Sequence, residues 1–242
     1  MNLIIDVGNT YVKFAVFKSK TLEYRTSFEH KAFESEYKKL KNRFPKLTKA
    51  IVSSVGRISK KTLAVVENDL TLIVLDHKIK IPFKNLYKTP ETLGVDRIAL
   101  VSASVDQYSN NNVLIIDAGT CITYDFVSAN NEYIGGAISP GLRLRYTSLN
   151  NLTANLPLLE VSQPKNIIGN STEESIHSGV VYGAIKEIDG LIDYYKSEHP
   201  DLTVILTGGD ANFLSNQLKN SIFANSNYLL EGLNFILDYN SK

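Results

Sequence analysis

The chain has 242 residues, 43% of them hydrophobic and 21% charged, which is typical of a globular protein with one large or two small domains. Its formal net charge is +1 and no run of five like charges occurs, which argues against nucleic acid or an anionic membrane as the main partner. Cys121 is the only cysteine, so no intramolecular disulfide can form, and no apolar stretch reaches the roughly 18 residues that span a bilayer. No basic, apolar leader is evident either, and we expect a cytoplasmic protein.

The first half of the chain predicts alternating strands and helices. Three strands separated by short polar turns are expected first, followed by a helix, a strand, a second helix and a short strand. Because strands and helices alternate after the initial meander, the pattern favours an α/β layer fold. These expected elements cover residues 3–7, 11–17, 23–28, 31–43, 50–54, 59–68 and 71–75.

An irregular segment over residues 79–91 precedes the next helix. Thr89 and Pro90 predict its start, with Thr89 as the N-cap and Pro90 at the first helical position. The helix would turn Leu93, Ile98 and Val101 inward. From Asn112 onward, three strands over 113–117, 122–127 and 132–138 are expected, and Ser139-Pro140-Gly141 then begins another helix.

The last third of the chain predicts a long helix, a strand and two further helices. Ser171 and Glu174 have the spacing of a capping box at the start of the long helix. Gly179 and Gly183 lie four residues apart on it, which indicates a close helix–helix contact, either within the chain or between subunits. A strand over 202–206, a Gly208-Gly209 turn, and helices over 211–218 and 228–239 complete the chain.

An internal repeat is the most informative feature of the sequence. Residues 3–10 read LIIDVGNT and residues 114–121 read LIIDAGTC, so the same apolar run, Asp and Gly recur 111 positions apart. Each copy predicts a buried strand, an Asp at its polar end, and a Gly turn into a second apolar run. Two such hairpins indicate two similar half-domains that face a cleft.

Each predicted hairpin suits a metal-bound polyphosphate. Gly lets backbone N–H groups approach phosphate oxygens, and Mg²⁺ often takes only one or two carboxylates besides water and phosphate. Asp6 and Asp117 would open into the cleft, with Asn9, Thr10 and Thr120 as further donors. A single copy would favour an ordinary Asp-Gly turn, but two copies in equivalent settings favour phosphate binding.

Two further motifs indicate a binding or catalytic role less strongly than the hairpins do. Gly208 and Gly209 follow a strand and precede a helix, where a nucleoside ring can lie against the backbone. In Gly94-Val95-Asp96-Arg97, Asp96 can accept a proton from a hydroxyl and Arg97 can hold a carboxylate. From the residues alone, a helix N-terminus with a surface Arg pair is the better interpretation of that segment.

Other familiar signatures are missing from the sequence. It contains no Walker A motif, no G-x-G-x-x-G fingerprint and no G-x-S-x-G elbow. The four histidines are scattered, which favours structural or surface roles, and Cys121 is interpreted as a small packing residue.

Five motifs in order resemble those of type III pantothenate kinases. They are Asp6-Val7-Gly8-Asn9-Thr10, Gly94-Val95-Asp96-Arg97, Asp117-Ala118-Gly119-Thr120, Gly135-Gly136 through Ser139-Pro140-Gly141, and Thr207-Gly208-Gly209. That family belongs to the acetate kinase, sugar kinase, Hsp70 and actin superfamily. The resemblance implies an α/β fold of two ribonuclease-H-like halves, residues 1–111 and 112–242, with a nucleotide cleft between them.

The resemblance implies ATP-dependent phosphorylation of pantothenate to 4′-phosphopantothenate, the first step of coenzyme A biosynthesis, in a homodimer. Asp96 would be the general base, Asp117 would bind a monovalent cation (K⁺ or NH₄⁺), and Mg²⁺ would lie near Asp6. With the Gly pair included, the expected ATP-binding residues are Asp6, Val7, Gly8, Asn9, Thr10, Tyr11, Val12, Lys13, Thr120, Gly208 and Gly209. The expected pantothenate-binding residues are Tyr87, Gly94, Val95, Asp96, Arg97 and Thr172.

Two alternatives remain open from the sequence. One is a nucleotide-binding, non-catalytic regulator of the same family, against which the intact Asp6, Asp96 and Asp117 argue. The other is a different phosphotransferase or a polyphosphate hydrolase of the superfamily, against which the Gly94-to-Arg97 segment argues.

Overall fold

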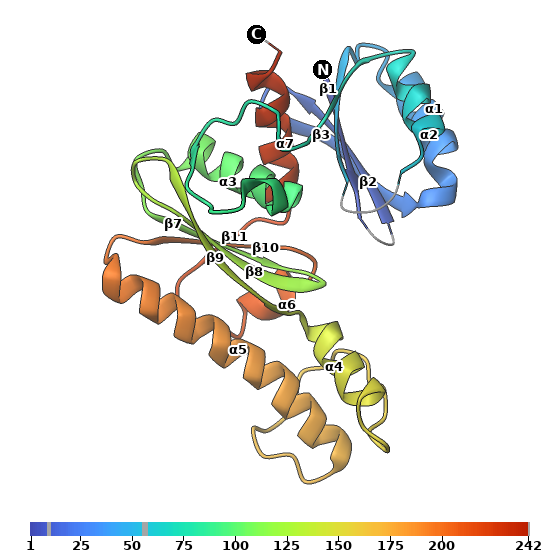
Figure 1. Ribbon diagram of the computed structural model, residues 1–242. Coiled ribbons are helices and arrows are strands. Elements are labelled where there is room, and N and C mark those ends of the chain that lie inside the picture. The colour runs from blue at the N-terminus through green and yellow to red at the C-terminus, as the bar shows by residue number, and fades with distance from the viewer. Residues whose placement is uncertain (9–10, 55–57, 242) are drawn as a thin grey trace. The chain divides into compact units, whose positions relative to one another are not determined.

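The computed structural model describes residues 1–8, 11–54 and 58–241, and the chain divides into two compact units (Figure 1). Unit 1 comprises Met1–Ser109 and Asn227–Lys242, and unit 2 comprises Asn110–Ser226. Across the described residues, no helix is both long and apolar enough to cross a membrane. The elements are β1 (Asn2–Val7), β2 (Tyr11–Lys18), β3 (Thr21–Glu29), η1 (His30–Ala32), α1 (Phe33–Arg43), β4 (Lys49–Ser54), α2 (Lys60–Glu67), β5 (Thr71–Val74), β6 (Lys84–Asn85), η2 (Pro90–Thr92), α3 (Val95–Gln107), β7 (Val113–Ala118), β8 (Cys121–Val127), β9 (Glu132–Pro140), α4 (Leu142–Asn151), α5 (Thr172–Glu198), β10 (Thr203–Thr207), α6 (Ala211–Ser215), β11 (Phe223–Ala224) and α7 (Tyr228–Tyr239).

Unit 1 is built on a sheet with the strand order β3-β2-β1-β4-β5. β1 pairs antiparallel with β2 and parallel with β4, and all six of its residues are buried because helices cover both faces of the sheet. Leu3, Ile5 and Val7 belong to one core with Phe33 and Tyr37 of α1. On the other face, α7 packs against β1 and β4, and α3 packs against α7 and β4 (Figure 1). Successive strand residues alternate in direction, so Asp6 points to the face that α3 and α7 cover.

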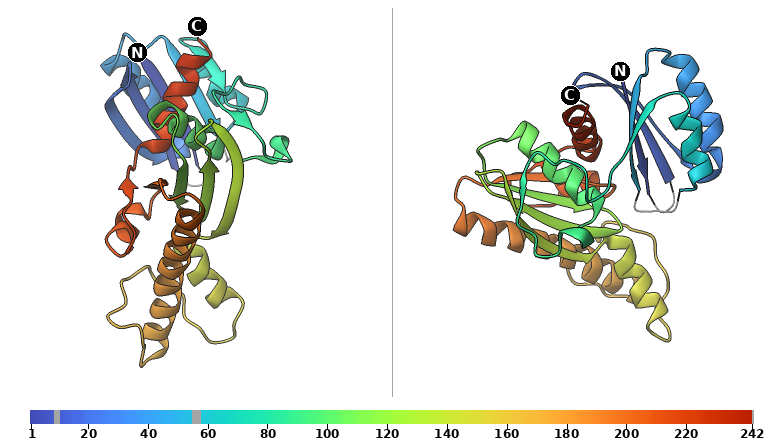
Figure 2. Two further views of the ribbon diagram at one scale, coloured as in Figure 1. Left: turned by 90° about the vertical axis from the view of Figure 1, so that its left-hand side faces the viewer. Right: turned by 45° about the horizontal axis from the view of Figure 1, so that its top comes forward.

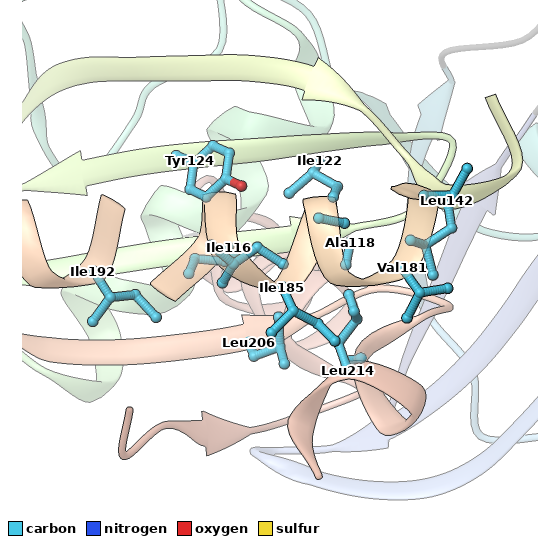
Figure 3. Close-up of a cluster of buried hydrophobic side chains, with 14 of the residues drawn as sticks. Ile116, Ala118, Ile122, Tyr124, Leu142, Val181, Ile185, Ile192, Leu206 and Leu214 are labelled. Carbon is cyan, nitrogen blue, oxygen red and sulfur yellow. The ribbon is translucent and has the colours of Figure 1, made fainter. Parts of the chain in front are cut away.

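Unit 2 repeats this topology with the strand order β9-β8-β7-β10-β11. β7 pairs antiparallel with β8 and parallel with β10, as β1 does with β2 and β4. The repeat found in the sequence therefore extends from one hairpin to a whole sheet. Ile116 and Tyr124 on one face of this sheet pack against Val181 and Ile185 of α5 (Figure 3).

Between β9 and β10, unit 2 carries a larger helical segment than unit 1 has between β3 and β4. Unit 1 has α1 there, whereas unit 2 has α4, a long connection and the 27-residue helix α5. The N-terminal part of α5 runs beyond the sheet beside α4 (Figure 2). As predicted, Ser171 caps α5, because its Oγ accepts a hydrogen bond from the Glu174 backbone N–H at 3.2 Å.

The helix predicted to begin at Pro90 begins instead at Val95. Pro90–Thr92 form a separate 3₁₀ turn, and Leu93 then adopts an extended conformation (φ −66°, ψ 127°). The extended backbone lets Leu93 bury its side chain and makes Gly94 the N-cap of α3. The Thr-Pro signal therefore marks a real helical turn, but not the start of the long helix.

The C-terminal helix lies in unit 1, although residues 112–242 were expected to form one half. α7 buries Leu233 and Ile236, and its Gly232 packs so closely on α3 that an added Cβ would lie 1.9 Å from the Ala99 carbonyl oxygen. Asn234 Oδ1 also accepts a hydrogen bond from Asn2 Nδ2 at 2.8 Å. The periodicity predicted the helix correctly, but it carries no information about which sheet the helix covers.

Two smaller interpretations also change. Gly179 and Gly183 lie on the exposed side of α5, and an added Cβ on either would meet no described atom within 4 Å. They therefore make no close helix contact within the described chain, and a contact between subunits stays a prediction. Cys121 is exposed, so its interpretation as a packing residue is wrong.

Candidate active site

The first acidic hairpin places Asp6 beside a lysine. Asp6 on β1 is the register partner of Lys13 on β2, and Lys13 Nζ lies 3.2 Å from Asp6 Oδ2. The Gly8 N–H donates to the Tyr11 carbonyl at 3.0 Å, and His30 Nε2 lies 3.0 Å from the Gly8 carbonyl oxygen. The predicted nucleotide-binding residues Asn9 and Thr10 lie outside the described residues.

The other described residues at the turn of this hairpin differ in how deeply their side chains are buried. Val7 and Val12 are buried in the unit 1 core, so only their backbone groups can serve a ligand. Tyr11 is 53% exposed.

Asp6 is a buried carboxylate under opposing electrostatic influences. The residue is only 8% exposed, and burial raises the pKa of its carboxyl group above the ordinary value. The charge and hydrogen bond of Lys13 lower that pKa, while the negative charge of Asp96 raises it. Two carboxylates of unit 1 therefore lie within electrostatic range of each other, where a bound divalent cation would stabilise the ionised form of both.

The start of α3 brings four predicted substrate-binding residues together. Asp96 Oδ1 accepts a hydrogen bond from the Arg97 N–H at 2.9 Å and folds back over Gly94, where an added Cβ would lie only 2.3 Å from that oxygen. The Arg97 guanidinium carbon lies 5.6 Å from the centroid of the Tyr87 ring. Val95, the first residue of α3, lies between Gly94 and Asp96.

Arg97 is only 5% exposed, so the surface interpretation of this segment is wrong. A buried guanidinium beside an aromatic ring is more typical of a binding site than of a solvated helix end.

The second acidic hairpin places Asp117 beside a glycine. Asp117 on β7 is the register partner of Thr123 on β8 and of Thr207 on β10. Gly208 has φ +96°, and a Cβ added to it would lie 2.4 Å from Asp117 Oδ1 and 2.3 Å from the Ala118 carbonyl oxygen. The structure therefore brings Asp117 and the Gly208-Gly209 turn together, although 90 residues separate them in the sequence.

Thr120 lies at the exposed tip of this second hairpin. The Gly119 N–H donates to the Cys121 carbonyl at 2.9 Å, and the Gly141 N–H donates to the Thr120 carbonyl at 3.0 Å. Backbone hydrogen bonds on both sides therefore fix this turn, while Thr120 itself is exposed.

Thr172 lies in unit 2, whereas the other predicted pantothenate-binding residues lie in unit 1. It borders a cavity of about 950 Å³ between α4 and α5, together with Arg145, Leu149 and Gly179. The opening combines polar and apolar lining, as small-molecule sites commonly do.

Over residues 1–8, 11–54 and 58–241, the chain holds no group of three or more His, Cys, Asp or Glu side chains suited to a metal ion. Mg²⁺ in kinases is often held by one or two carboxylates with substrate phosphates and water, so Asp6 fits such an ion without a larger cluster.

Sequence reasoning missed two contacts that support the hairpin turns. His30 contacts the Gly8 carbonyl, and Gly141 packs under Thr120, where a Cβ would lie 2.1 Å from the Gly119 carbonyl oxygen. The spacing of His30 gives no signal for its contact. The sequence around Gly141 predicts only the start of a helix.

A family model for type III pantothenate kinases matches residues 2–194 of the chain. The chain belongs to the type III pantothenate kinase family. It is 51% identical over 240 residues to a type III pantothenate kinase of Christiangramia forsetii, with 99% of both chains covered. It is 50% identical over 240 residues to one of Flavobacterium johnsoniae, covering 99% of this chain and 98% of the relative.

Solved structures resemble the fold of this pantothenate kinase at low sequence identity. A Campylobacter jejuni protein described as a Baf family transcriptional activator aligns with a TM-score of 0.66 at 23% identity, covering 98% of both chains. Glucokinase from an Antarctic psychrotroph aligns with a TM-score of 0.55 at 12% identity, again covering 98% of both. The predicted fold class, α/β with two ribonuclease-H-like halves of the actin-like ATPase kind, is confirmed.

The family relation fixes the reaction. The enzyme transfers a phosphoryl group from ATP to pantothenate and so forms 4′-phosphopantothenate, the first step of coenzyme A biosynthesis. Neither the regulator nor a different phosphotransferase is favoured.

Proposed function

We propose that both acidic hairpins bind one ATP molecule and that Asp96 is the general base of the pantothenate kinase reaction. The observation that carries this proposal is in unit 1, where Asp6 pairs with Lys13 and lies within electrostatic range of Asp96. The next residue, Arg97, lies beside the Tyr87 ring. Asp96 accepts the proton of the pantothenate primary hydroxyl as that oxygen attacks the γ-phosphorus in line. Catalysis then depends mainly on alignment and charge neutralisation.

In this proposal, residues 6–13 and Thr120 bind the phosphates, and Gly208 and Gly209 support the nucleoside. Asp6 holds Mg²⁺, which neutralises charge on the phosphate oxygens when it is bound. Lys13, at 3.2 Å from Asp6, is close enough to contribute its charge to the same phosphates. The conformation of Gly208 supports its role, because only a residue without Cβ fits against Asp117 and Ala118 there.

A monovalent cation, K⁺ or NH₄⁺, is assigned to Asp117. Its carboxylate lies at the end of β7 beside the Gly208 turn and is partly exposed, so an ion can reach it. A fixed positive charge there would lower the cost of enclosing the strongly anionic ATP.

Pantothenate is assigned to Tyr87 and to residues 94–97 in unit 1, and to Thr172 in unit 2. Arg97 supplies the planar donor set that a carboxylate prefers, and Tyr87 provides an apolar surface beside it. Thr172 borders the α4–α5 cavity, which is large enough for a small molecule.

A homodimer is part of the proposal, with pantothenate near the subunit interface. Several large apolar side chains of the segment between α4 and α5 are exposed, including Ile168 at 81%, and Gly179 and Gly183 leave the adjacent face of α5 open. Exposed apolar side chains beside an open helix face are typical of a subunit contact. Light scattering after size-exclusion chromatography tests this, and a monomer at all micromolar concentrations would contradict it.

The direct test is a product assay with purified protein, ATP, Mg²⁺ and pantothenate, in K⁺ and in Na⁺. We expect 4′-phosphopantothenate by mass spectrometry and a higher rate in K⁺. Equal rates in both salts would remove the cation from Asp117, and phosphorylation of added sugars or acetate instead of pantothenate would contradict the substrate assignment. The proposed cytoplasmic location and the absence of nucleic-acid and membrane partners are tested separately, by cell fractionation and by gel-shift and vesicle sedimentation assays.

A further inference from the structure

A polar cluster in unit 2 has no role in the reaction described so far. Its centre is Glu187 of α5, whose carboxylate accepts three hydrogen bonds from three different elements. Tyr124 of β8 donates through its hydroxyl at 2.9 Å, Ser139 of β9 through Oγ at 2.5 Å, and Arg145 of α4 through Nη2 at 2.6 Å. Glu187 therefore ties the long helix to both strands and to the helix that follows them.

The ion pair in this cluster is partly buried, and its environment favours the charged form of Glu187. The side chains of Glu187 and Arg145 are 29% and 20% exposed, so solvent screens their ion pair less than it screens a surface pair. Burial by itself would raise the pKa of Glu187, but the hydrogen bonds from Arg145, Ser139 and Tyr124 outweigh burial and lower the pKa below its ordinary value. Burial and the nearby Glu187 charge raise the pKa of Tyr124, so its hydroxyl remains a donor.

Arg145 links Glu187 to the end of β9. Its Nη2 binds Glu187, while its Nε donates to the Pro140 carbonyl at 2.8 Å. Two points of attachment fix a planar guanidinium in both position and orientation. The Arg145 backbone N–H also donates to the Gly141 carbonyl at 3.1 Å, within the first turn of α4.

The backbone at Pro140 and Gly141 in turn supports the tip of the second acidic hairpin. The Gly141 N–H donates to the Thr120 carbonyl at 3.0 Å. A Cβ on Gly141 would lie 2.1 Å from the Gly119 carbonyl oxygen and 2.5 Å from that of Thr120, so the two backbones are in direct contact. A shift of the β9–α4 junction would therefore move the backbone of Gly119 and Thr120.

We propose that Glu187 is a positioning residue for phosphoryl transfer, which acts through Arg145 and the Pro140-Gly141 backbone to fix the Gly119-Thr120 turn. This inference rests on the proposed contact of Thr120 with ATP. Arg145 also borders the α4–α5 cavity next to Thr172, so the Glu187–Arg145 pair fixes one wall of that cavity as well. The same ion pair thus sets the geometry of a nucleotide-binding turn and of a substrate-binding wall in one unit.

The test is the variant Glu187→Gln. Glutamine keeps the size of the side chain but presents one oxygen and one NH₂ group to three donors, so Arg145 loses its anchor. We expect kcat/KM for ATP to fall about 10- to 100-fold, the range seen when residues that orient a ligand group are changed, with a rise in the KM for ATP. Glu187→Asp retains the charge and should recover part of the loss.

Glu160→Gln is the matched control. Glu160 pairs at 2.6 Å with Arg143, which lies on α4 as Arg145 does. The side chains of Glu160 and Arg143 are 79% and 63% exposed. We expect wild-type kinetics from this variant, because exposed ion pairs contribute little. Tyr124→Phe and Ser139→Ala each remove one donor to Glu187, and we expect smaller changes in the KM for ATP in the same direction, even if Glu187→Gln is poorly folded.

The outcomes separate this inference from the proposed function. A folded Glu187→Gln variant with wild-type kcat and KM for ATP would overturn the positioning role. A variant with a lower melting temperature but unchanged kinetics would also overturn it, since that result indicates a purely structural role. Thr120→Ala tests the ATP contact by itself, and in the double variant with Glu187→Gln the two effects should be less than additive, because both act on one turn.

Discussion

The two acidic hairpins share one backbone plan but differ in what surrounds the Asp. In unit 1, Asp6 is nearly buried, pairs with Lys13 and lies within electrostatic range of Asp96. In unit 2, Asp117 is partly exposed and lies against Gly208. The two hairpins therefore have similar backbones, but different neighbouring residues give Asp6 and Asp117 different electrostatic environments. Unit 1 surrounds its Asp with charged groups, whereas the Asp of unit 2 is partly exposed and lies against the backbone of a glycine.

The segment between the third and fourth strands extends this difference. Unit 1 has the 11-residue helix α1 there, while unit 2 has α4 and the 27-residue helix α5. The addition creates the cavity that Thr172 borders and the Glu187 cluster beneath the second hairpin. A segment that adds surface in this way can acquire binding functions without changing the sheet.

The largest expected effect comes from Asp96 in unit 1, the proposed general base. Asp96→Asn should lower kcat about 10²- to 10⁴-fold, because the hydroxyl of pantothenate loses its proton acceptor, while ATP binding is retained. Stopped assays and calorimetry with a non-hydrolysable ATP analogue measure the two quantities. Asp106→Asn is the matched control, since Asp106 lies on the same helix and pairs with Lys20 at 2.8 Å. Near wild-type turnover in Asp96→Asn would remove Asp96 from the role of base.

The next effect tests the glycine that lies against Asp117 in unit 2. Gly208→Ala should destabilise the protein by about 1–3 kcal/mol, because alanine is strained at φ +96° and its Cβ would collide with Asp117 and Ala118. It should also raise the KM for ATP. Gly209→Ala serves as the stability control, since a Cβ there meets no described atom within 4 Å. Equal melting temperatures for the two variants would show that the backbone at Gly208 is not constrained as described.

The smallest effect is a pH dependence of stability that arises from the buried Asp6. Because its folded-state pKa is raised above the ordinary 3.8, the folded protein binds this proton more tightly than the unfolded chain does. Stability is therefore lost as pH rises from about 4 through the folded pKa. Asp6→Asn cannot ionise, so its stability relative to wild type should increase over that rise.

Urea unfolding at several pH values between 4 and 7 measures this difference. In Lys13→Met, the loss of stability with rising pH should be larger than in wild type, because the Lys13 charge that lowers the pKa of Asp6 is removed. A difference between Asp6→Asn and wild type that is constant over this pH range would contradict the burial argument.

The sequence predicted most of the fold because its strongest signals are local. The apolar runs of β1 and β7, the Asp-Gly turns and the Ser171 cap are all readable from neighbouring residues. The placement of α7 in unit 1 could not be predicted, since an amphipathic helix shows that it needs an apolar surface but not which one. The break at Leu93 also depends on tertiary burial of that side chain.

For the site, the repeat predicted the two carboxylates but not their neighbours. Without the family resemblance, the residues around Asp96 favour an ordinary helix N-terminus over a catalytic role. The position of Asp96 near Asp6 depends on how α3 packs on the sheet. The Glu187 cluster joins residues at positions 124, 139, 145 and 187, and contacts between such distant positions leave no periodic pattern in one sequence.

The central claim is that the two hairpins bind one nucleotide and take different cations. A crystal structure with a non-hydrolysable ATP analogue, Mn²⁺ in place of Mg²⁺ and Rb⁺ in place of K⁺ tests it directly, because anomalous scattering distinguishes the two ions. We predict the manganese peak beside Asp6 and the rubidium peak beside Asp117, both next to the same triphosphate. A nucleotide that contacts only one hairpin, or both ions beside the same Asp, would contradict the account.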